Sequence, residues 1–589
     1  MSRLWISPSR GVCLRDALFR HASHHVKSGK KIICRTVYTT PPPGNRYRQL
    51  SVKVTDNRDT PDAEFWSDTP WHTLKPYKHA WEKYWKGTHQ VGKYHPGLVI
   101  LFTPSLLPWL NDDTFIPKIL KKVSHISKAG LENDPPVVYD VMCACVDGIA
   151  PEEHYGTFHE QLATQGISFL HSPSFKIFGY VNSPMLKEKD DSDKSPSPTK
   201  PAAITFGKGH RRLDHVTVPL ANTIFQNGKP SFFQHTRWDA KDGQYILRKK
   251  WDDKRWGSIF AFAGINKPLF SFLPARPVTP FRAIESGMGN IVRELRFDGG
   301  DVGPASRELE TVVSEISESL GGTTVDIWAL IAPNEVVSAV AENMPEHGPE
   351  YVGFWLDKGA TICRVVSGGG GWGPKQGLLS LDPQTTYTTT EASSELSTER
   401  DVTSLGSLAQ PGASIQFLAI DNDLPRPLAA RKLPAIGERK SIVFGAIPST
   451  IDEILKVSSE GQATKYNYRV GHFGCVSGSG IFYSRDRPNP VGKSKADAVS
   501  KSPEEPAANS NQAPPSLITH TKIDLPYSYI YMDGRVASQR KQDFEERTVL
   551  RSRMLIEEQK RLKERLNRFP KSRHILNKNQ TVQQDQPKE

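Results

Sequence analysis

The chain has 589 residues, which exceeds one ordinary domain and predicts two or three folded units with linkers and tails. Its apolar share of 37% is low, and its 45 Pro and 44 Gly indicate long loops. Six scattered cysteines exclude the disulfide framework of a small secreted protein, and no apolar run reaches the ~20 residues of a membrane helix. We therefore expect a soluble or peripheral protein and exclude a proteolipid-type membrane subunit.

The net charge of +12 is concentrated in two segments. Residues 1–40 hold eight Lys or Arg and one acidic residue, and residues 535–573 hold thirteen basic and six acidic residues. Together these segments carry more positive charge than the whole chain, so the remainder is slightly acidic. A nucleic-acid role for the whole protein is unsupported, and any such role belongs to the C-terminal tail.

Residues 1–40 have the composition of a mitochondrial transit peptide. They are rich in Arg and Ser, almost free of acids, and able to form a short amphipathic helix through Leu14, Leu18 and Phe19. The segment Arg35 to Pro41 resembles a processing site with arginine just before the cut. We expect delivery to the mitochondrial matrix; the alternative is a basic tail without regular structure.

Residues 41–90 form a Pro- and Trp-rich extension with tryptophans at 66, 71, 81 and 85. Trp81 and Trp85 are four residues apart and would lie on one helix face. We expect such a helix to dock its aromatic side chains on the main domain. The alternative is an exposed platform on which bases stack.

Residues 91–185 predict a strand, a helix and a second strand. Leu98–Phe102 is a continuous apolar run, a helix is expected from Asp113 to Val123, and Val137–Val146 reads as another buried strand. Strands joined by such a helix are expected to be parallel. Cys143 and Cys145 share a face of the second strand, and we interpret them as packed core thiols rather than metal ligands.

A Ser-, Pro- and charge-rich segment, 186–203, is expected to be a disordered insertion. Residues 204–485 then predict short strands of a more antiparallel half. His215, His235 and Arg237 lie among these strands and are interpreted as structural polar residues. The predicted fold class is therefore α+β, with mixed sheets, a strand-helix-strand N-terminal half and a separate C-terminal helix.

One stretch carries a resemblance to a known family. The sequence from Gly289 to Leu295, followed by a helix from Pro304 to Leu320, resembles the C-terminal half of the FIST-domain family. Leu98–Phe102 and Val141–Gly148 are similar to the family's N-terminal half, so the resemblance spans roughly residues 90–485. It implies an α+β sensory domain that binds small ligands in signalling proteins, and it supplies no catalytic residues or cofactor.

A segment expected to be extended, Tyr351 to Val366, precedes the glycine-rich loop 367–377. This loop is the first ligand-binding candidate, through Gly369, Gly370, Gly371, Trp372 and Lys375. Its spacing departs from a phosphate-binding loop, because proline follows the last glycine of the run and no hydroxyl follows the lysine. A nucleotide loop, a different binding loop and a structural turn with a packed tryptophan all stay open.

The turn containing Gly287, Gly289 and Asn290 is the second ligand-binding candidate. No motif of the sequence pairs a nucleophile with a base or assembles a metal site, so we favour a non-enzymatic protein. Catalytic groups can converge from distant positions, which leaves an enzyme open.

The last part of the chain divides into a disordered linker, 486–516, and a basic helical tail, 517–589. A helix expected at 537–569 carries a narrow apolar stripe at heptad-like spacing. Candidate residues for binding a partner or RNA are Arg547, Arg551, Arg553, Arg561, Lys563 and Arg565. The helix could pack on the body, form a coiled coil with a partner, or bind RNA or an anionic membrane.

The preferred hypothesis is a mitochondrial FIST-like protein that binds a small ligand or acts as a scaffold, attached to a partner by its C-terminal helix. The alternative is an RNA- or mitoribosome-associated accessory factor that uses that basic helix.

Overall fold

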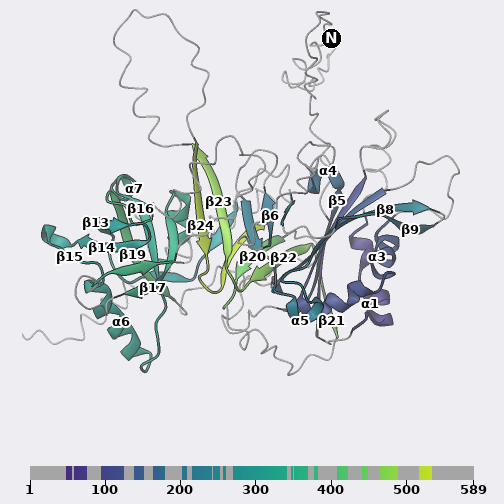
Figure 1. The fold of residues 1–589 in the computed structure, drawn as a ribbon, viewed down its shortest axis with the longest axis horizontal. Helices are drawn as coiled ribbons and strands as arrows, with labels where there is room; N and C mark the ends of the chain where they lie inside the picture. The colour runs from purple at the N-terminus through teal and green to yellow at the C-terminus, as the bar shows by residue number, and fades with distance from the viewer. Residues whose placement is uncertain are drawn as a thin grey trace, which may run out of the picture. The chain divides into compact units, whose positions relative to one another are not determined.

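The computed structural model describes seventeen segments of the chain, all within one compact unit, Arg46–Glu589. They are 48–55, 59–75, 95–124, 138–150, 164–178, 202–207, 215–241, 243–251, 256–259, 269–340, 347–348, 351–368, 377–382, 408–421, 441–448, 465–488 and 516–533. Within these segments, helices and strands form mixed and antiparallel sheets, which confirms the α+β fold class (Figure 1). No helix among them is long and apolar enough to cross a bilayer.

Sheet I contains the predicted strand-helix-strand unit. Its order is β21 (Tyr466–Val470), β1 (Arg48–Val54), β5 (Gly166–Pro173), β2 (Pro96–Phe102), β3 (Val138–Cys145), β8 (Phe233–Lys241) and β9 (Gln244–Trp251). As predicted, β2 and β3 are parallel, and α3 (Phe115–Val123) lies between them in the chain. The helix begins two residues later than expected, at Phe115 rather than Asp113, and the Asp112 carboxylate accepts the Thr114 N–H just before it.

Sheet II repeats this arrangement, and its three central strands come from the second half of the chain. Its order is β11 (Phe270–Phe272), β25 (Ser528–Asp533), β20 (Ser441–Ala446), β22 (His472–Ser477) and β4 (Gly148–Ile149). Here β20 and β22 are parallel, and β25 is antiparallel to β20, just as β5 is antiparallel to β2. The two sheets therefore contain equivalent three-strand units.

The remaining strands form sheet III and a barrel. Sheet III has the order β10 (Trp256–Ile259), β6 (Ala203–Gly207), β7 (His215–Pro219), β23 (Ile481–Pro488) and β24 (Ser516–Ile523). The barrel strands are β19 (Ala413–Ile420), β13 (Arg282–Met288), β14 (Ile291–Arg296), β18 (Leu379–Leu381), β17 (Thr361–Gly368) and β16 (Ile327–Pro333). The ring closes because β16 pairs with both β17 and β19. Short strands β12 (Ala275–Pro277) and β15 (Val302–Pro304) pair with β19 and β14.

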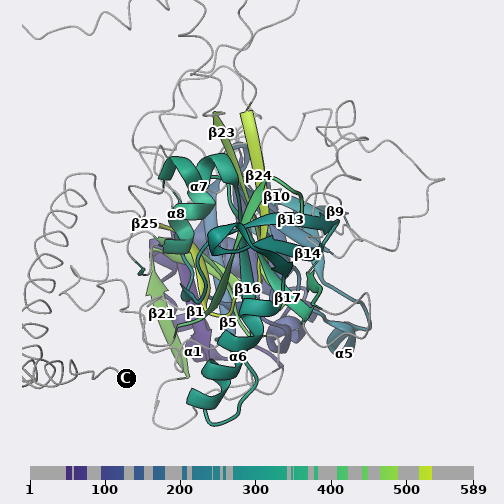
Figure 2. The ribbon, with the colours of Figure 1, turned by 90° about the vertical axis from the view of Figure 1, so that its left-hand side faces the viewer.

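Helices cover parts of these sheets. Three surround the barrel strands in Figure 2: α6 (Arg307–Ser319), α7 (Asn334–Val340) and α8 (Tyr351–Asp357). The others are α1 (Ala63–Asp68), α4 (Ser174–Ile177), α5 (Ile224–Asn227), and the 3₁₀ helices η1 (Trp71–Thr73), η2 (Pro104–Asn111) and η4 (Asp298–Gly300). The predicted helix Pro304–Leu320 starts too early, because Pro304 ends β15 and the helix begins at Arg307.

The largest apolar core draws side chains from all four groups of strands. Leu101 and Ala144 come from sheet I, and Phe444 comes from sheet II. Phe206 of sheet III stacks on Phe444 with ring centroids 4.3 Å apart. A fully buried side chain of this kind contributes about 2 kcal/mol, so the shared core fixes the sheets against one another.

The N-terminal extension contributes to the body as well. Its strand β1 lies between β5 and β21, and Phe65, Trp66 and Trp71 pack into an aromatic cluster with Trp109. Asp62 caps α1 by accepting the Phe65 N–H. The predicted Trp81 and Trp85 helix lies outside the described residues.

Three further expectations were wrong in part. Tyr351–Val366 was expected to be extended, and its second part is extended in β17, but Tyr351–Asp357 is helical, because Tyr351, Val352, Trp355 and Leu356 recur at helical spacing and face the shared core. The insertion was expected to run to residue 203, yet Ala203 begins β6. Residues 517–533 were assigned to a helical tail but form β24 and β25, which pair with β23 and β20. The rest of the tail, residues 534–589, lies outside the described residues.

Because β24 and β25 belong to the core, truncations on either side of them should behave differently. A chain ending at Pro515 loses both strands and with them Ile523, Leu525 and Tyr529, all fully buried. We expect it to lose cooperative thermal unfolding. A chain ending at Gly534 should unfold within a few degrees of the full chain, measured by circular dichroism. Equal unfolding of the two truncations would contradict this assignment.

Candidate functional site

The carboxyl ends of the two parallel strand pairs converge at one point. Asp147 follows β3 where the chain leaves sheet I and enters sheet II as β4. Its Oδ2 accepts the N–H of Gly478, which follows β22, at 2.8 Å. In sheets with parallel strands, ligands bind beyond the carboxyl ends, so this convergence is the first place to look for a site.

A row of small and polar residues crosses sheet II beside Asp147. In the ladder, Ser528 of β25 lies opposite Ala446 of β20, and Ala446 lies opposite Ser477 of β22. The hydroxyl of Ser477 hydrogen-bonds to Asp147. We call Asp147, Ser477, Ala446 and Ser528 the carboxyl-end row.

The carboxyl-end row lies at the margin of the shared core. Residues two positions earlier on the same strands, Phe444 and Cys475, belong to that core, as does Ile530 two positions after Ser528. Since side chains two apart on a strand share a face, the row continues the core face of sheet II. Ala446 is the smallest member, so the side chains of Ser477 and Ser528 extend further from the sheet than the Ala446 side chain between them.

One hydroxyl of the row is buried and unsatisfied. Ser528 is 1% exposed, and its Oγ has no hydrogen-bond partner among the residues that the structure describes. Leaving a buried polar group unpaired costs about 1–3 kcal/mol, so such a group calls for a partner. A bound small molecule would supply one.

Asp147 is the charged member of the row. Burial raises the pKa of its carboxyl above the ordinary value, and the hydrogen bonds from Gly478 and Ser477 oppose this rise only in part. Carboxyls with raised pKa values gather at functional sites, because desolvation prepares them to bind or exchange protons.

The backbone beside the row is strained at one residue. Tyr527 has φ of 63°, the only non-glycine residue with positive φ among the described residues, and its N–H donates to the Ala446 carbonyl. Left-handed backbone at a bulky residue is costly and concentrates at sites with a role beyond packing.

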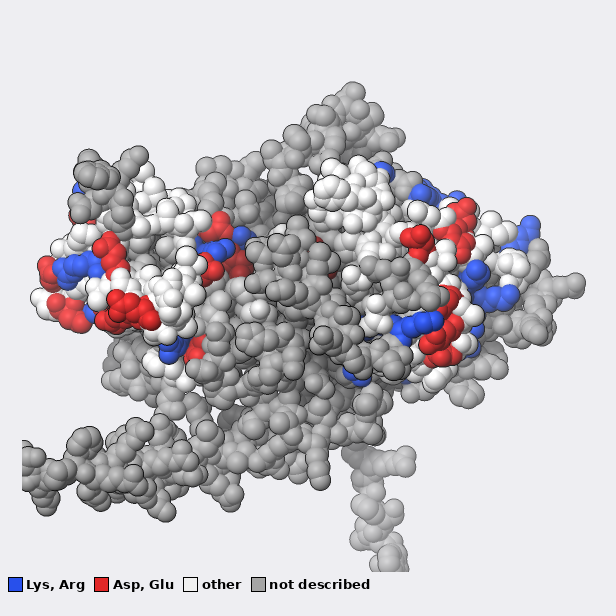
Figure 3. All heavy atoms as spheres, turned by 90° about the horizontal axis from the view of Figure 1, so that it is seen from below, with Lys and Arg blue, Asp and Glu red and all other residues white. Residues whose placement is uncertain are grey.

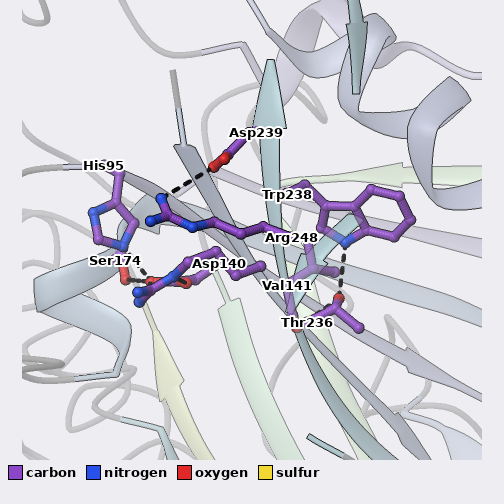
Figure 4. Close-up of polar contacts among 9 residues, drawn as sticks. His95, Asp140, Val141, Ser174, Thr236, Trp238, Asp239 and Arg248 are labelled. Carbon is purple, nitrogen blue, oxygen red and sulfur yellow. Dashed lines mark hydrogen bonds and ion pairs between the residues drawn. The ribbon is translucent and has the colours of Figure 1, made fainter. Parts of the chain in front are cut away.

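A second polar cluster lies at the opposite, amino ends of β2 and β3 (Figure 4). The Asp140 carboxylate is 0% exposed and contacts His95 Nε2. It accepts hydrogen bonds from Ser174 Oγ at 2.6 Å and from Arg237 Nε at 2.8 Å. Burial acts to raise the pKa of Asp140, but the hydrogen bonds from His95 and Arg237 prevail and lower it.

The Asp140 cluster contains Ser, His and Asp but not in a catalytic order. Ser174 donates to the carboxylate rather than to His95, so the three residues are not connected in the order Ser-His-Asp. Both carboxylate oxygens already have partners, which are His95, Ser174 and Arg237. We interpret it as a fixed ion-pair network, which matches the structural role predicted for Arg237.

The remaining sequence candidates divide into two groups. Gly369, Gly370, Gly371, Trp372 and Lys375, and the arginines and lysine of the C-terminal helix, lie outside the described residues. Gly289, with φ of 63°, and Asn290 form the turn between β13 and β14. Asn290 Nδ2 donates to the Leu381 carbonyl at 2.7 Å, and Gly289 accepts the Ala409 N–H.

The close packing of this turn explains its glycines. A Cβ on Gly287 would lie 2.3 Å from the Ala409 carbonyl oxygen, so the loop can approach only a glycine. A ligand role for Gly287, Gly289 and Asn290 stays a prediction. Cys143 and Cys145 lie in the apolar core of sheet I, as expected, and burial raises the pKa of the Cys143 thiol to about 12.

Sequence reasoning missed the carboxyl-end row. Asp147 and Gly478 are 331 positions apart, and no local spacing connects them. The available signal was that a buried strand ends just before Asp147-Gly148 and another just before Gly478-Ser479-Gly480. The chain matches no protein-family profile, no curated protein and no solved structure at a significant level.

Removing Arg237 should expose the cost of burying Asp140. We expect Arg237→Ala to lower the free energy of unfolding by about 3 kcal/mol, because it leaves a buried carboxylate with fewer donors. Arg248→Ala is the control, since Arg248 is 60% exposed and 3.6 Å from Asp239, and should change stability by less than about 0.5 kcal/mol. Similar losses for both variants in urea unfolding would contradict the network.

The raised pKa of Asp147 predicts a pH-dependent effect. A carboxyl whose pKa is higher in the folded protein than its unfolded value of ~3.9 stabilises the folded state fully at pH values below ~3.9. This stabilisation is lost as the pH rises through the pKa of the folded state. Asp147→Asn removes the ionisation and can still accept the Gly478 N–H. We therefore expect the variant to gain stability relative to the unaltered chain between pH 4 and pH 7.

Asp298→Asn provides the control. Hydrogen bonding to Arg282 lowers the pKa of the Asp298 carboxyl, so its contribution to stability is nearly complete at pH 4 and is lost only as the pH falls further; the effect of this variant should therefore change little between pH 4 and pH 7. Urea unfolding at both pH values checks the pair. An Asp147→Asn effect that is the same at pH 4 and pH 7 would show that burial does not perturb Asp147.

Proposed function

We propose that the chain is a non-enzymatic, mitochondrial FIST-like protein whose α+β body binds a small polar molecule at the carboxyl-end row. One observation carries the proposal: a desolvated carboxyl, Asp147, lies where two parallel strand pairs end, in a row with the unsatisfied hydroxyl of Ser528. The mitochondrial assignment rests on the composition of residues 1–40.

The chemistry of the row constrains the molecule. Asp147 accepts hydrogen bonds, and a ligand that donates to it would offset its desolvation. A second polar group on the ligand would pair with Ser528 Oγ. A compact molecule with a hydrogen-bond donor at one end and a further polar group at the other therefore fits these residues.

The alternative, an RNA- or mitoribosome-associated factor, depends on the basic residues of the C-terminal helix, which the structure does not describe. On the face shown in Figure 3, basic and acidic side chains are interspersed, so this face of the body does not support the RNA alternative. Nucleic-acid surfaces are instead dominated by positive charge. A scaffold role, with partners held by the tail, is compatible with either function.

Ligand binding is testable by thermal shift. In a screen of small metabolites against the full chain, a binder present at 100 times its Kd should stabilise the protein by about 2.7 kcal/mol. Asp147→Asn and Ser528→Ala should each abolish most of that stabilisation. Ser172→Ala should preserve it, because Ser172 is also buried with an unsatisfied hydroxyl but lies in sheet I. Stabilisation retained in both row variants would refute the site.

A further inference from the structure

The outer strand of sheet I, β9, is exposed in an unusual way. It pairs with β8 on one side, and no other described strand pairs with it (Figure 1). Tyr245 is buried, but the next five residues, 246–250, are all exposed. Alternate residues of a strand in a covered sheet would be buried, so this part of β9 has both faces in solvent.

The exposed part of β9 combines apolar and basic side chains. Ile246 and Leu247 are 52% and 44% exposed, and Arg248, Lys249 and Lys250 follow them. The Asp239 carboxylate of β8 lies 3.6 Å from Arg248 and pairs with it. Lys249 lies over the ring of Trp251 at 4.8 Å.

This charge pattern distinguishes between possible occupants of the edge. Lysines on an edge strand protect it from pairing with another copy of itself. Pairing with a second β9 would bring Arg248, Lys249 and Lys250 close to the same three cations of the other copy. An acidic strand would instead be attracted. A peptide strand also satisfies the main-chain groups along the edge, which a nucleic acid does not.

We propose that the outer edge of β9 binds an extended, acidic peptide segment of a partner protein, which adds a strand to sheet I. The main chain of β9 would set the register of the peptide on either side of Arg248, where the pairing of β9 with β8 shifts by one residue. Acidic side chains of the peptide would contact Arg248, Lys249 and Lys250, and apolar side chains on its two faces would cover Ile246 and Leu247. This surface is separate from the carboxyl-end row and does not depend on the ligand proposed there.

The test uses the full chain and a fluorescein-labelled eight-residue peptide of two Glu-Glu-Val-Val repeats, which places both residue types on each face of the added strand. Fluorescence anisotropy should show binding that weakens at least about tenfold in the double variant Lys249→Glu, Lys250→Glu. The double variant Arg293→Glu, Lys358→Glu makes the same change of charge at exposed barrel-side residues and should bind as the unaltered chain does.

Two further probes separate strand addition from simple charge attraction. The same peptide methylated at alternate main-chain nitrogens keeps its charge but cannot form a ladder, so it should lose binding. A single-stranded oligouridine of equal charge should bind more weakly than the peptide. Equal binding of the methylated and unmodified peptides, or preferred binding of the RNA, would overturn the proposal.

Hydrogen exchange keeps the test valid if a charge variant fails to fold. In the unaltered chain, the peptide should slow amide exchange within residues 246–250. Unchanged exchange there at a saturating peptide concentration would also overturn the proposal.

Discussion

The apolar core shared by the three sheets and the barrel is the constraint on which the other features depend. Its members come from positions as distant as Leu101 and Ile530, and the stacked pair Phe206 and Phe444 links sheets II and III. Burial of this surface is what brings β3 and β22 close enough for their carboxyl ends to meet. The carboxyl-end row exists because the core stops there and polar residues take over its margin.

The convergence at Asp147 has an energetic cost that packing alone does not explain. A carboxyl whose pKa is raised by burial makes the folded state less stable at neutral pH, and Asn at this position would keep the Gly478 hydrogen bond without that cost. Ser528 and the strained Tyr527 add to the cost in the same place. Unfavourable local features that coincide are typical of binding sites, where function and stability are in conflict.

Parts of this fold were predictable from local pattern. The run Leu98–Phe102, the helical spacing of Ile116, Ile119 and Val123, and the run after Val137 predicted β2, α3 and β3, because continuous apolar segments and a 3.6-residue period have few other solutions. α8 was misassigned because a short apolar segment fits either a strand or a buried helix. Neither propensity nor spacing indicated that residues 517–533 would return to the core.

The candidate site was beyond such patterns for a related reason. The glycine-rich loop attracted attention because its composition is unusual, whereas Asp147, Ser477 and Ser528 are ordinary residues that only long-range pairing brings into one row. Register, not motif, makes them a group. The internal equivalence of the β2–β3 and β20–β22 units was likewise invisible, since their sequences share little beyond apolar runs.

A crystal structure of the full chain with the small molecule that most raises its Tm would test whether that molecule binds at the carboxyl-end row. We expect electron density for that molecule over Ala446, within hydrogen-bond distance of Asp147 and Ser528. Density for the molecule elsewhere, with the Ser528 hydroxyl paired to another group of this chain, would contradict it.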